Sequence, residues 1–269
     1  MDNSPSGLDL THVRHDLSAA AVIRSKGRRG FGANQNLVLV RVVAERRARY
    51  VLVLNDDAEL GTSSVTTLVR CADQRPRTGA VGPFMPGSGP SMFAWPTRAS
   101  QALGSVFPRF LLRPTAEEGW LTGACMLVRT DALAEVGLFD PQYFLFFEDT
   151  DLCRRLTNAG WHTEHCSAAT AVHHRRQTTT RTSTEVEIQK QMFRSQYLYC
   201  RKHHGRLAAR VLNGLARSAL LARTVKFALV EAAAGRSGRI TVSRLLTFTL
   251  FFRPSRPTRF EIEAREQLA

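Results

Sequence analysis

The sequence is poor in cysteine. Five cysteines are spread over 269 residues, at Cys71, Cys125, Cys153, Cys166 and Cys200. Disulfide frameworks and zinc clusters use even or closely spaced sets of cysteines. The odd number and the wide spacing argue against both kinds of site, and we expect these side chains to be small, buried hydrophobic groups.

Long apolar runs are also missing. No segment approaches the ~18 uninterrupted apolar residues of a membrane span, and the first residues lack the charged-then-apolar pattern of a secretory signal peptide. A hydrophobic content of 43% is still enough for a globular core. We therefore expect a cytoplasmic protein that forms one large domain, or one domain with an appendage.

Acidic residues are scarce in the C-terminal part. Residues 170 to 269 contain 19 Lys and Arg against 6 Asp and Glu, a net charge of +13, whereas residues 1 to 169 contain 18 against 17, a net charge of +1. From Gly205 onward arginines are spaced among Leu, Ala and Val, and the apolar residues 245 to 252 follow. Almost all of the net charge of +14 therefore lies in residues 170 to 269.

A basic amphipathic helix of this kind is typical of an element that lies on an anionic membrane surface, or of a nucleic-acid patch. A solvated helical bundle is the alternative. The segment has no aromatic residues alternating with the basic ones and no nucleic-acid motif, so we favour the membrane and expect no nucleic-acid partner. The protein would then be cytoplasmic, or peripheral on the inner face of the cell membrane.

Three carboxylates follow a group of aromatic residues. The aromatic residues are Tyr143, Phe144, Phe146 and Phe147, and the carboxylates are Glu148, Asp149 and Asp151. An apolar wall would desolvate a carboxylate, raise its pKa and make it a better proton acceptor near neutral pH. The alternative is a helix N-terminus, where acidic residues complement the helix dipole and Asp149 or Thr150 is the cap. This pattern alone leaves both interpretations open.

A second acidic site follows residues 50 to 54 (YVLVL). This apolar run is typical of a buried parallel strand, and it ends at Asn55, Asp56 and Asp57. Ligands of open α/β sheets bind at the carboxyl ends of strands. Two carboxylates there suit Mg²⁺ or Mn²⁺ shared with a diphosphate, because these ions keep positions open for substrate oxygens. A polar turn without a ligand is the alternative.

Alternating strand and helix signals predict an α/β fold. We expect one helix at about residues 34 to 47, a second at about residues 149 to 158 that stops at Ala159 and Gly160, and a helical tail from near Thr184. The segment from Gly79 to Pro114 is rich in Gly, Pro and Ser. It predicts a long surface loop or lid around an acceptor.

The two acidic sites resemble those of family 2 of the inverting, nucleotide-sugar-dependent glycosyltransferases, and in particular its rhamnosyltransferase-like branch. The resemblance covers about residues 1 to 205. Residues 29 to 36 (RGFGANQN) resemble the family's N-x-G-F segment, with Arg28 where asparagine is usual, and residues 54 to 58 (LNDDA) resemble its L-N-x-D motif. Residues 136 to 140 (VGLFD) and 147 to 155 (FEDTDLCRR) match its catalytic block almost letter for letter.

This resemblance implies the GT-A fold, a Rossmann-like mixed α/β sheet. The transferase domain would cover residues 1 to 204, and residues 205 to 269 would form the basic helical extension. Asp149 is implied as the general base, with Glu148 in the same catalytic pair. Gly123 and Asp151 are expected on the acceptor side.

The resemblance also implies a divalent cofactor, Mn²⁺ or Mg²⁺. Asp57 is the expected metal ligand, and His173 would complete the metal shell, with His174 as the alternative. The donor-binding residues implied are Asp2, Gly30, Asn34, Asp56 and Asp57.

The expected function is the transfer of a sugar, with inversion, from a nucleotide-diphospho-sugar to a hydroxyl group of a glycan or a lipid-linked acceptor, in cell-envelope polysaccharide synthesis. A non-catalytic membrane- or polyanion-binding protein derived from a decayed transferase is the alternative. The two hypotheses differ in whether the protein turns over a donor.

One feature departs from the family. Family members carry a first strand, a helix and part of a second strand before the element that Asp2, Asn3 and Ser4 resemble, and here Met1 directly precedes Asp2. A central parallel strand contributes ladder hydrogen bonds and two buried faces. We therefore expect a sheet truncated at its N-terminus, and an upstream reading frame that encodes the missing strand and helix.

Overall fold

The computed structural model describes residues 23, 29–86, 92–93, 96, 119–174 and 185–233. The elements in chain order are α1 (Phe31–Glu45), β1 (Tyr50–Leu54), β2 (Ala58–Leu60), α2 (Ser64–Asp73), β3 (Thr78–Phe84), β4 (Met92–Phe93), β5 (Trp120–Leu121), β6 (Cys125–Arg129), α4 (Thr130–Val136), α5 (Glu148–Asn158), β7 (His162–His173) and α7 (Glu185–Ala233). Helices and strands are interspersed along the chain, in agreement with the predicted α/β class, but they do not alternate strictly.

Five strands form a mixed sheet in the order β1-β6-β3-β7-β2. β3 and β7 run parallel, with Val81 opposite Glu164. The other three pairings, β1 with β6, β3 with β6 and β2 with β7, are antiparallel. A short antiparallel ribbon, β4 with β5, is separate from this sheet.

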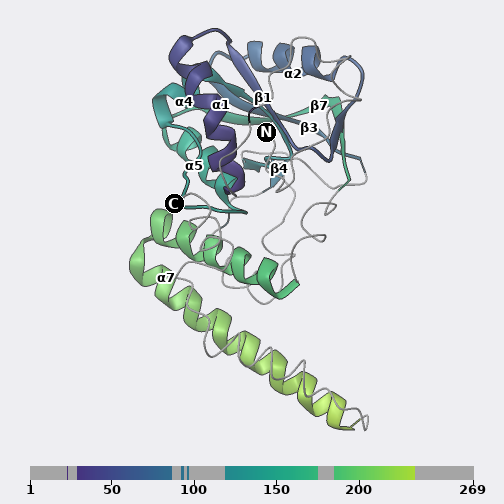
Figure 1. The fold of residues 1–269 in the computed structure, drawn as a ribbon, viewed down its shortest axis with the longest axis vertical. Helices are drawn as coiled ribbons and strands as arrows, with labels where there is room; N and C mark the ends of the chain where they lie inside the picture. Colours follow the sequence, from purple (N-terminus) through teal and green to yellow (C-terminus); the bar gives the residue numbers. More distant parts are fainter. Residues whose placement is uncertain are drawn as a thin grey trace.

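Helices cover both faces of the sheet (Figure 1). On one face α1, α4 and α5 bury Leu39, Leu133 and Leu152 in a core shared with Val53 of β1 and Met126 of β6. On the other face α2 contributes Leu68 and Ala72 to a second core, with Val81 and Leu127 from the strands. The sheet is therefore apolar on both sides, which is the pattern of a three-layer α/β domain.

The strand at residues 50 to 54 differs from its prediction. Among the described residues β1 pairs with β6 and runs antiparallel to it, and Val53 is its one buried residue. Its apolar run reflects burial on two faces, since Val51 and Val53 belong to one core and Leu52 to the other. A continuous apolar run indicates that both faces of a strand are covered. It does not indicate whether the neighbouring strand is parallel or antiparallel.

The predicted surface loop from Gly79 to Pro114 is wrong at its start. Residues 78 to 84 form β3, in the middle of the sheet, and the side chains of its first six residues are buried. Small residues are required here because a Cβ atom on Gly79 would lie 2.9 Å from Cβ of Trp161. From residue 87 to residue 114 the structure describes only residues 92, 93 and 96, so the rest of that prediction lies outside the described residues.

The predicted helices are present, with small shifts of their ends. α1 begins at Phe31 and α5 begins at Glu148, each slightly earlier than expected. Gly160, after the end of α5, has φ +79°, a left-handed conformation that glycine adopts easily. The tail helix begins at Glu185, next to the predicted position.

α7 is interrupted at Gly205, whose φ is +90°. Its first half lies beside the sheet domain, and its second half projects away from it (Figure 1). The two halves meet through Cys200, Ala209 and Leu212. Within the described residues, no helix carries an apolar stretch long enough to cross a bilayer. The end of the transferase domain at residue 204 remains a prediction.

The expectation for the cysteines is wrong for one pair. Cys71 of α2 and Cys166 of β7 form a disulfide, although 95 residues separate them. The fold packs α2 on β7 and brings their Cα atoms to 6.4 Å, a proximity that spacing along the chain cannot reveal. The other three, Cys125, Cys153 and Cys200, are buried free thiols, as expected.

The start of α1 packs closely on the segment that precedes α5. The Phe31 N–H donates to the Phe144 carbonyl at 2.9 Å. A Cβ atom on Gly30 would lie 2.4 Å from that same carbonyl oxygen. Glycine is therefore required at residue 30 for close approach of two backbones, which fixes α1 against the acidic cluster.

We predict that Gly30→Ala destabilises the protein, because the added methyl group displaces the backbone of Phe144. Overpacking of this kind costs about 1–3 kcal/mol. Urea unfolding monitored by circular dichroism would measure the change in the free energy of unfolding.

Gly214→Ala is the matched control. Gly214 is exposed on α7, and a Cβ atom there would have no neighbour within 4 Å. Alanine at this position should stabilise the helix by about 0.5–1 kcal/mol. Equal stability of the Gly30→Ala variant and the parent would contradict the close approach.

Candidate active site

A backbone turn of unusual conformation leads into α5. Phe146 has φ +69° and Phe147 has φ +66°, so two consecutive non-glycine residues are left-handed. Such residues are costly and cluster at functional sites, where the surrounding structure holds them. The turn ends directly before Glu148, the first residue of α5, and so sets the direction in which the carboxylate-bearing helix begins.

The Asp149 carboxylate is held by three hydrogen-bond donors. The backbone N–H of Gly123 donates to Oδ2 at 2.9 Å. The Thr150 N–H and hydroxyl donate to Oδ1 at 2.7 and 3.2 Å. A carboxylate has about four lone-pair positions, so the orientation is fixed while capacity to accept a proton remains.

Burial perturbs the acids of this helix end in opposite directions. Desolvation by burial raises the pKa of Asp149, and the donors from Gly123 and Thr150 reduce that rise without cancelling it. Burial alone would also raise the pKa of Asp151, but hydrogen bonds from His203 and Lys202 outweigh it and hold that pKa at about 2. Two carboxyl groups whose pKa values are shifted in opposite directions can take separate roles. Asp149 suits proton transfer, whereas Asp151 is a permanent anion.

Glu148 is the third acid of this helix end. Its side chain is buried, and Oε2 has no hydrogen-bond partner in the part of the chain that the structure describes. Burial, and then the nearby Asp149 carboxylate, raise the pKa of Glu148 well above its ordinary value. Two adjacent carboxylates in one apolar site favour a state in which one of them keeps its proton.

The second acidic site lies between β1 and the end of β7. His173 Nε2 is 3.0 Å from Asp57 Oδ1 and 3.4 Å from Asn55 Nδ2. Of the two neighbouring histidines, His173 therefore has its ring beside the Asp57 carboxylate. The ring of His174 instead lies 3.2 Å from the carboxylate of the exposed Glu59.

The residues present fit a divalent ion. Asp57 Oδ1 is buried and makes no hydrogen bond with the described residues, yet it faces the ring nitrogen of His173. Mg²⁺ and Mn²⁺ sites commonly use one or two protein ligands together with substrate phosphates. No group of three or more His, Cys, Asp and Glu that could hold a metal occurs among the described residues. The donor set is thus one carboxylate and one imidazole.

A short turn connects the two acidic sites. The Asn55 N–H donates to the Ala124 carbonyl at 2.9 Å, which extends the β1–β6 pairing by one residue. Gly123, the next residue back, donates to Asp149. The residues that follow β1 and the start of α5 therefore meet at the turn before β6.

The remaining donor-side residues have different surroundings. Gly30 and the buried Asn34 lie at the start of α1, and the Asn34 amide donates to the Arg29 carbonyl at 3.4 Å. Asp56 is exposed in the turn after β1. Asp2 lies outside the described residues. The donor-binding roles of these residues stay predictions.

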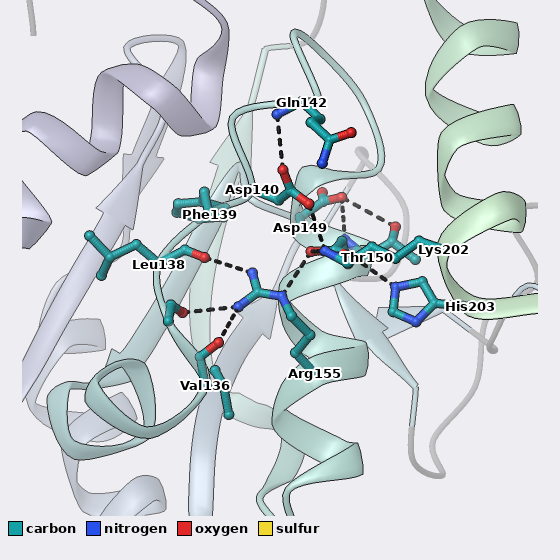
Figure 2. A network of polar contacts seen from close by, with 12 residues as sticks. Val136, Leu138, Phe139, Asp140, Gln142, Asp149, Thr150, Arg155, Lys202 and His203 are labelled. Carbon is teal, nitrogen blue, oxygen red and sulfur yellow. Dashed lines mark hydrogen bonds and ion pairs between the residues drawn. The ribbon is translucent and has the colours of Figure 1, made fainter. Parts of the chain in front are cut away.

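Asp151, expected on the acceptor side, lies in a polar network with Arg155, Lys202 and His203, three residues that are labelled in Figure 2. Its side chain is 0% exposed, and it accepts from Arg155 at 2.9 Å, from Lys202 at 2.8 Å and from His203 at 2.8 Å. Arg155 also donates to the carbonyls of Val136 and Leu138, which ties the Gly-Leu-Phe-Asp turn to α5. An acceptor-side role for Asp151 is still a prediction, and every described contact of its carboxylate is internal.

Sequence reasoning missed the residues that support the site. Lys202 and His203 lie some fifty residues after Asp151, and His203 is 52 positions from its partner. Thr150, one of the two expected caps, instead donates to Asp149. Asn36 was part of the quoted α1 motif, and its amide both donates to and accepts from the Phe139 backbone, at 2.7 and 3.1 Å. The signal for Asn36 was present in that motif, whereas no local pattern marks Lys202 or His203.

We predict that Glu148→Gln stabilises the fold at neutral pH. A carboxyl whose pKa is raised in the folded state favours unfolding once the pH exceeds its unfolded value, about 4.3. The parent should therefore lose stability relative to the variant as the pH rises above that value. Below it, the two proteins should unfold alike. Thermal unfolding over a series of pH values would measure this.

Glu59→Gln is the control for that experiment, because the Glu59 side chain is 78% exposed. Its stability should change little with the substitution. A Glu148→Gln variant that is less stable than the parent at neutral pH would show that Glu148 is ionised and paired in the fold.

Curated relatives of this chain are rhamnosyltransferases. The N-acetylglucosaminyl-diphospho-decaprenol L-rhamnosyltransferase of Mycobacterium tuberculosis is 33% identical over 150 residues, which cover 49% of this chain and 49% of the relative. Rhamnosyltransferase WbbL of Escherichia coli is 26% identical over 165 residues, which cover 56% of this chain and 62% of the relative. The chain spans about half the length of the first of these relatives, and less than two thirds of the second.

Among solved structures, the mannosyltransferase PcManGT from Pyrobaculum calidifontis, in complex with GDP-Man and Mn²⁺, is 14% identical, with a TM-score of 0.49 over 91% of this chain and 75% of that one. The family described as "Glycosyltransferase like family 2" matches residues 12–197, well over half of the chain. This match agrees with the mixed α/β sheet and confirms the predicted GT-A fold class. The chain belongs to the family 2-like glycosyltransferases.

Proposed function

We propose that this chain transfers a sugar, with inversion of configuration, from a nucleotide-diphospho-sugar to a hydroxyl group of a lipid-linked or glycan acceptor. The observation that carries the proposal is the Asp149 carboxylate. It is fixed by Gly123 and Thr150, and its pKa is raised by burial. These are the properties of a general base that works near neutral pH.

In the proposed reaction Asp149 removes the proton from the acceptor hydroxyl as that oxygen attacks the anomeric carbon. The bond to the nucleotide diphosphate breaks on the opposite face, so one displacement inverts the configuration. Gly123 and Thr150 keep the carboxylate oriented through the transfer. The buried Glu148, kept protonated beside it, leaves the pair with a single negative charge.

Asp57 and His173 would hold the divalent ion, Mn²⁺ or Mg²⁺. The bound ion would neutralise charge on the departing diphosphate. Asp57 is suited to this task because Oδ1 is buried without a hydrogen bond to the described residues and faces His173 at 3.0 Å. The donor site would then lie where β1 ends, adjacent to Asp149 through the turn before β6.

The names of the relatives suggest the substrates. The M. tuberculosis protein is named for rhamnosyl transfer to a diphospho-decaprenol-linked N-acetylglucosamine, and the E. coli protein is named as a rhamnosyltransferase. We infer an L-rhamnose donor and a diphospho-polyprenol-linked acceptor for this chain, with a role in cell-envelope polysaccharide synthesis.

We further propose that α7 lies on an anionic membrane surface. Six exposed apolar side chains after Gly205 repeat at intervals of four residues in two groups, Leu207, Val211 and Leu215, and then Leu221, Val225 and Leu229. Helical periodicity places all six on one face. Leu207 is the most exposed of them, at 74%, and several exposed apolar side chains on one face mark an interaction surface.

Basic residues flank this apolar face. Arg206 and Arg210 lie on one side of it and Lys226 on the other, and all three are exposed. An apolar stripe flanked by cations is the pattern of a helix that lies in the interface of an anionic bilayer. A lipid-linked acceptor would be presented at that same surface. The protein would then be peripheral on the cytoplasmic face of the membrane.

We predict that two substitutions separate the base from the metal site. Asp149→Asn should leave donor binding near normal and reduce turnover by ~10²–10⁴, the usual contribution of a general base. Asp57→Asn should abolish the donor binding that depends on Mn²⁺ and leave the fold intact. Nucleotide release from a panel of UDP-, GDP- and dTDP-linked sugars, with a prenyl-diphosphate acceptor, would measure turnover, and calorimetry would measure donor binding.

Asp56→Asn is the control, since Asp56 is exposed, and its effect should be smaller than that of Asp57→Asn. Full turnover by Asp149→Asn would place the base elsewhere. A parent protein that binds vesicles and releases no nucleotide from any donor would support the alternative, a non-catalytic binding protein.

We predict that binding to vesicles depends on anionic lipid, on salt and on the apolar face of α7. Replacement of Arg206 and Arg210 by Gln should weaken binding by about 2 kcal/mol, or roughly thirtyfold, at roughly 1 kcal/mol for each basic residue. Leu207→Glu should also weaken it. At 1 M salt the Debye length falls to about 3 Å, so the parent should be released. Co-sedimentation with vesicles would measure each effect.

Val65→Glu is the control, because Val65 is an exposed apolar residue on α2, outside this surface. That variant should bind as the parent does. Equal binding of the parent to neutral and to anionic vesicles would exclude an electrostatic role for the helix.

A further inference from the structure

The first half of α7 contacts the left-handed turn directly. The Ser195 hydroxyl, fully buried, donates to the Leu145 carbonyl at 2.7 Å. The ring of Tyr199 packs on the ring of Phe147, with centroids 5.5 Å apart. Left-handed, non-glycine residues persist where surrounding contacts over-determine them. α7 supplies such contacts on one side of the turn, and Phe31 of α1 supplies a backbone hydrogen bond on the other.

The same helix also binds the buried anion that follows Asp149. Lys202 Nζ lies 2.8 Å from Asp151 Oδ1 and 2.6 Å from Asp140 Oδ2, so it joins the Gly-Leu-Phe-Asp turn to α5 (Figure 2). His203 Nε2 lies 2.8 Å from Asp151 Oδ1. Arg155, from α5 itself, is the third partner of this carboxylate. Two of the three partners of Asp151 therefore belong to another element.

These contacts lie on both sides of Asp149 along the chain. The left-handed pair ends one residue before Glu148, and Asp151 lies in the same first turn of α5 as Asp149. The segment that carries Asp149 is thus fixed at both its ends by side chains of α7. The hydrogen bond from Gly123 fixes the Asp149 carboxylate itself. Loss of an α7 contact would let the helix start relax toward ordinary backbone conformations and rotate the carboxylate.

We propose that Lys202 and His203 are positioning residues of the active site, which act through Asp151 and the Phe146–Phe147 turn to aim the Asp149 carboxylate. The proposal rests on the proposed role of Asp149 as the base. It makes the first half of α7 part of the catalytic apparatus, although this helix carries no residue of the catalytic motif.

Two substitutions of His203 separate its hydrogen bond from its packing. His203 lies against the Tyr199 ring, with centroids 4.5 Å apart. His203→Phe keeps an aromatic ring there and removes the donor to Asp151. His203→Gln removes the ring and keeps a donor. Lys202→Met removes the second donor from α7, and Arg201→Met is the matched control, because Arg201 is the exposed neighbouring cation on the same helix.

The first measurement is steady-state turnover with the nucleotide-sugar panel. His203→Phe and Lys202→Met should lower kcat about tenfold, the effect of one lost hydrogen bond to a charged group, with an unchanged KM for the donor. His203→Gln should restore most of kcat, and Arg201→Met should not change it. A change in donor KM alone, or a normal kcat in both His203→Phe and Lys202→Met, would overturn the proposal.

The second measurement is amide hydrogen exchange by NMR, which needs no substrate. The Gly123 and Thr150 amides, which donate to Asp149, should exchange about tenfold faster in His203→Phe and Lys202→Met. The amides of Ala80 and Val81 in β3 should be unchanged. Equal acceleration at β3 would show that these residues only stabilise the domain, and unchanged exchange at Gly123 and Thr150 would show that they do not position Asp149. Either result overturns the proposal.

The two measurements also distinguish this proposal from the proposed function. If Asp149→Asn keeps full turnover while His203→Phe loosens the Gly123 and Thr150 amides, the base is wrongly assigned and the positioning of this turn by α7 stands.

Discussion

The structure depends on how three carboxylates, two of them buried and one half-buried, are held side by side at the start of α5. Isolated charges in an apolar site are strongly unfavourable, so each acid needs its own compensation. Asp151 has two cations, Arg155 and Lys202, and a hydrogen bond from His203. Asp149 has three hydrogen-bond donors, and Glu148 has a raised pKa that keeps its proton. The N-terminus of the helix adds a favourable field for all three. The turn before β6 supplies a donor to Asp149, and α7 supplies two partners of Asp151.

These compensations explain much of the packing around the site. The turn before β6 provides the Gly123 N–H, and α1 approaches closely enough that glycine is required at residue 30. The left-handed residues Phe146 and Phe147 bring the acids to the helix end while their rings stay in the apolar surroundings. The site therefore combines desolvation with fixed donors, which is the arrangement that prepares a carboxylate to accept a proton.

α7 serves two different tasks on either side of Gly205. Its first half is buried against the acidic cluster through Ser195, Tyr199 and His203. Its second half exposes an apolar face between basic residues. In the proposed function the first half aims the base and the second half meets the lipid surface, so one helix would relate the catalytic centre to the membrane that presents the acceptor.

The sequence alone determined the fold class, the family and three of the helices. Local periodicity and turn residues placed these helices at about residues 34, 149 and 184, within a few residues of their observed starts, and the motif around Glu148 and Asp149 identified the family, because both depend on residues close together in the chain. Tertiary structure decided what joins distant segments. It set the antiparallel pairing of β1, the central position of β3 and the Cys71–Cys166 disulfide. It also decided which side chains compensate the Asp151 charge, because a buried charge is compensated by whichever element packs on it, and Lys202 and His203 of α7 reach Asp151 only when the chain is folded.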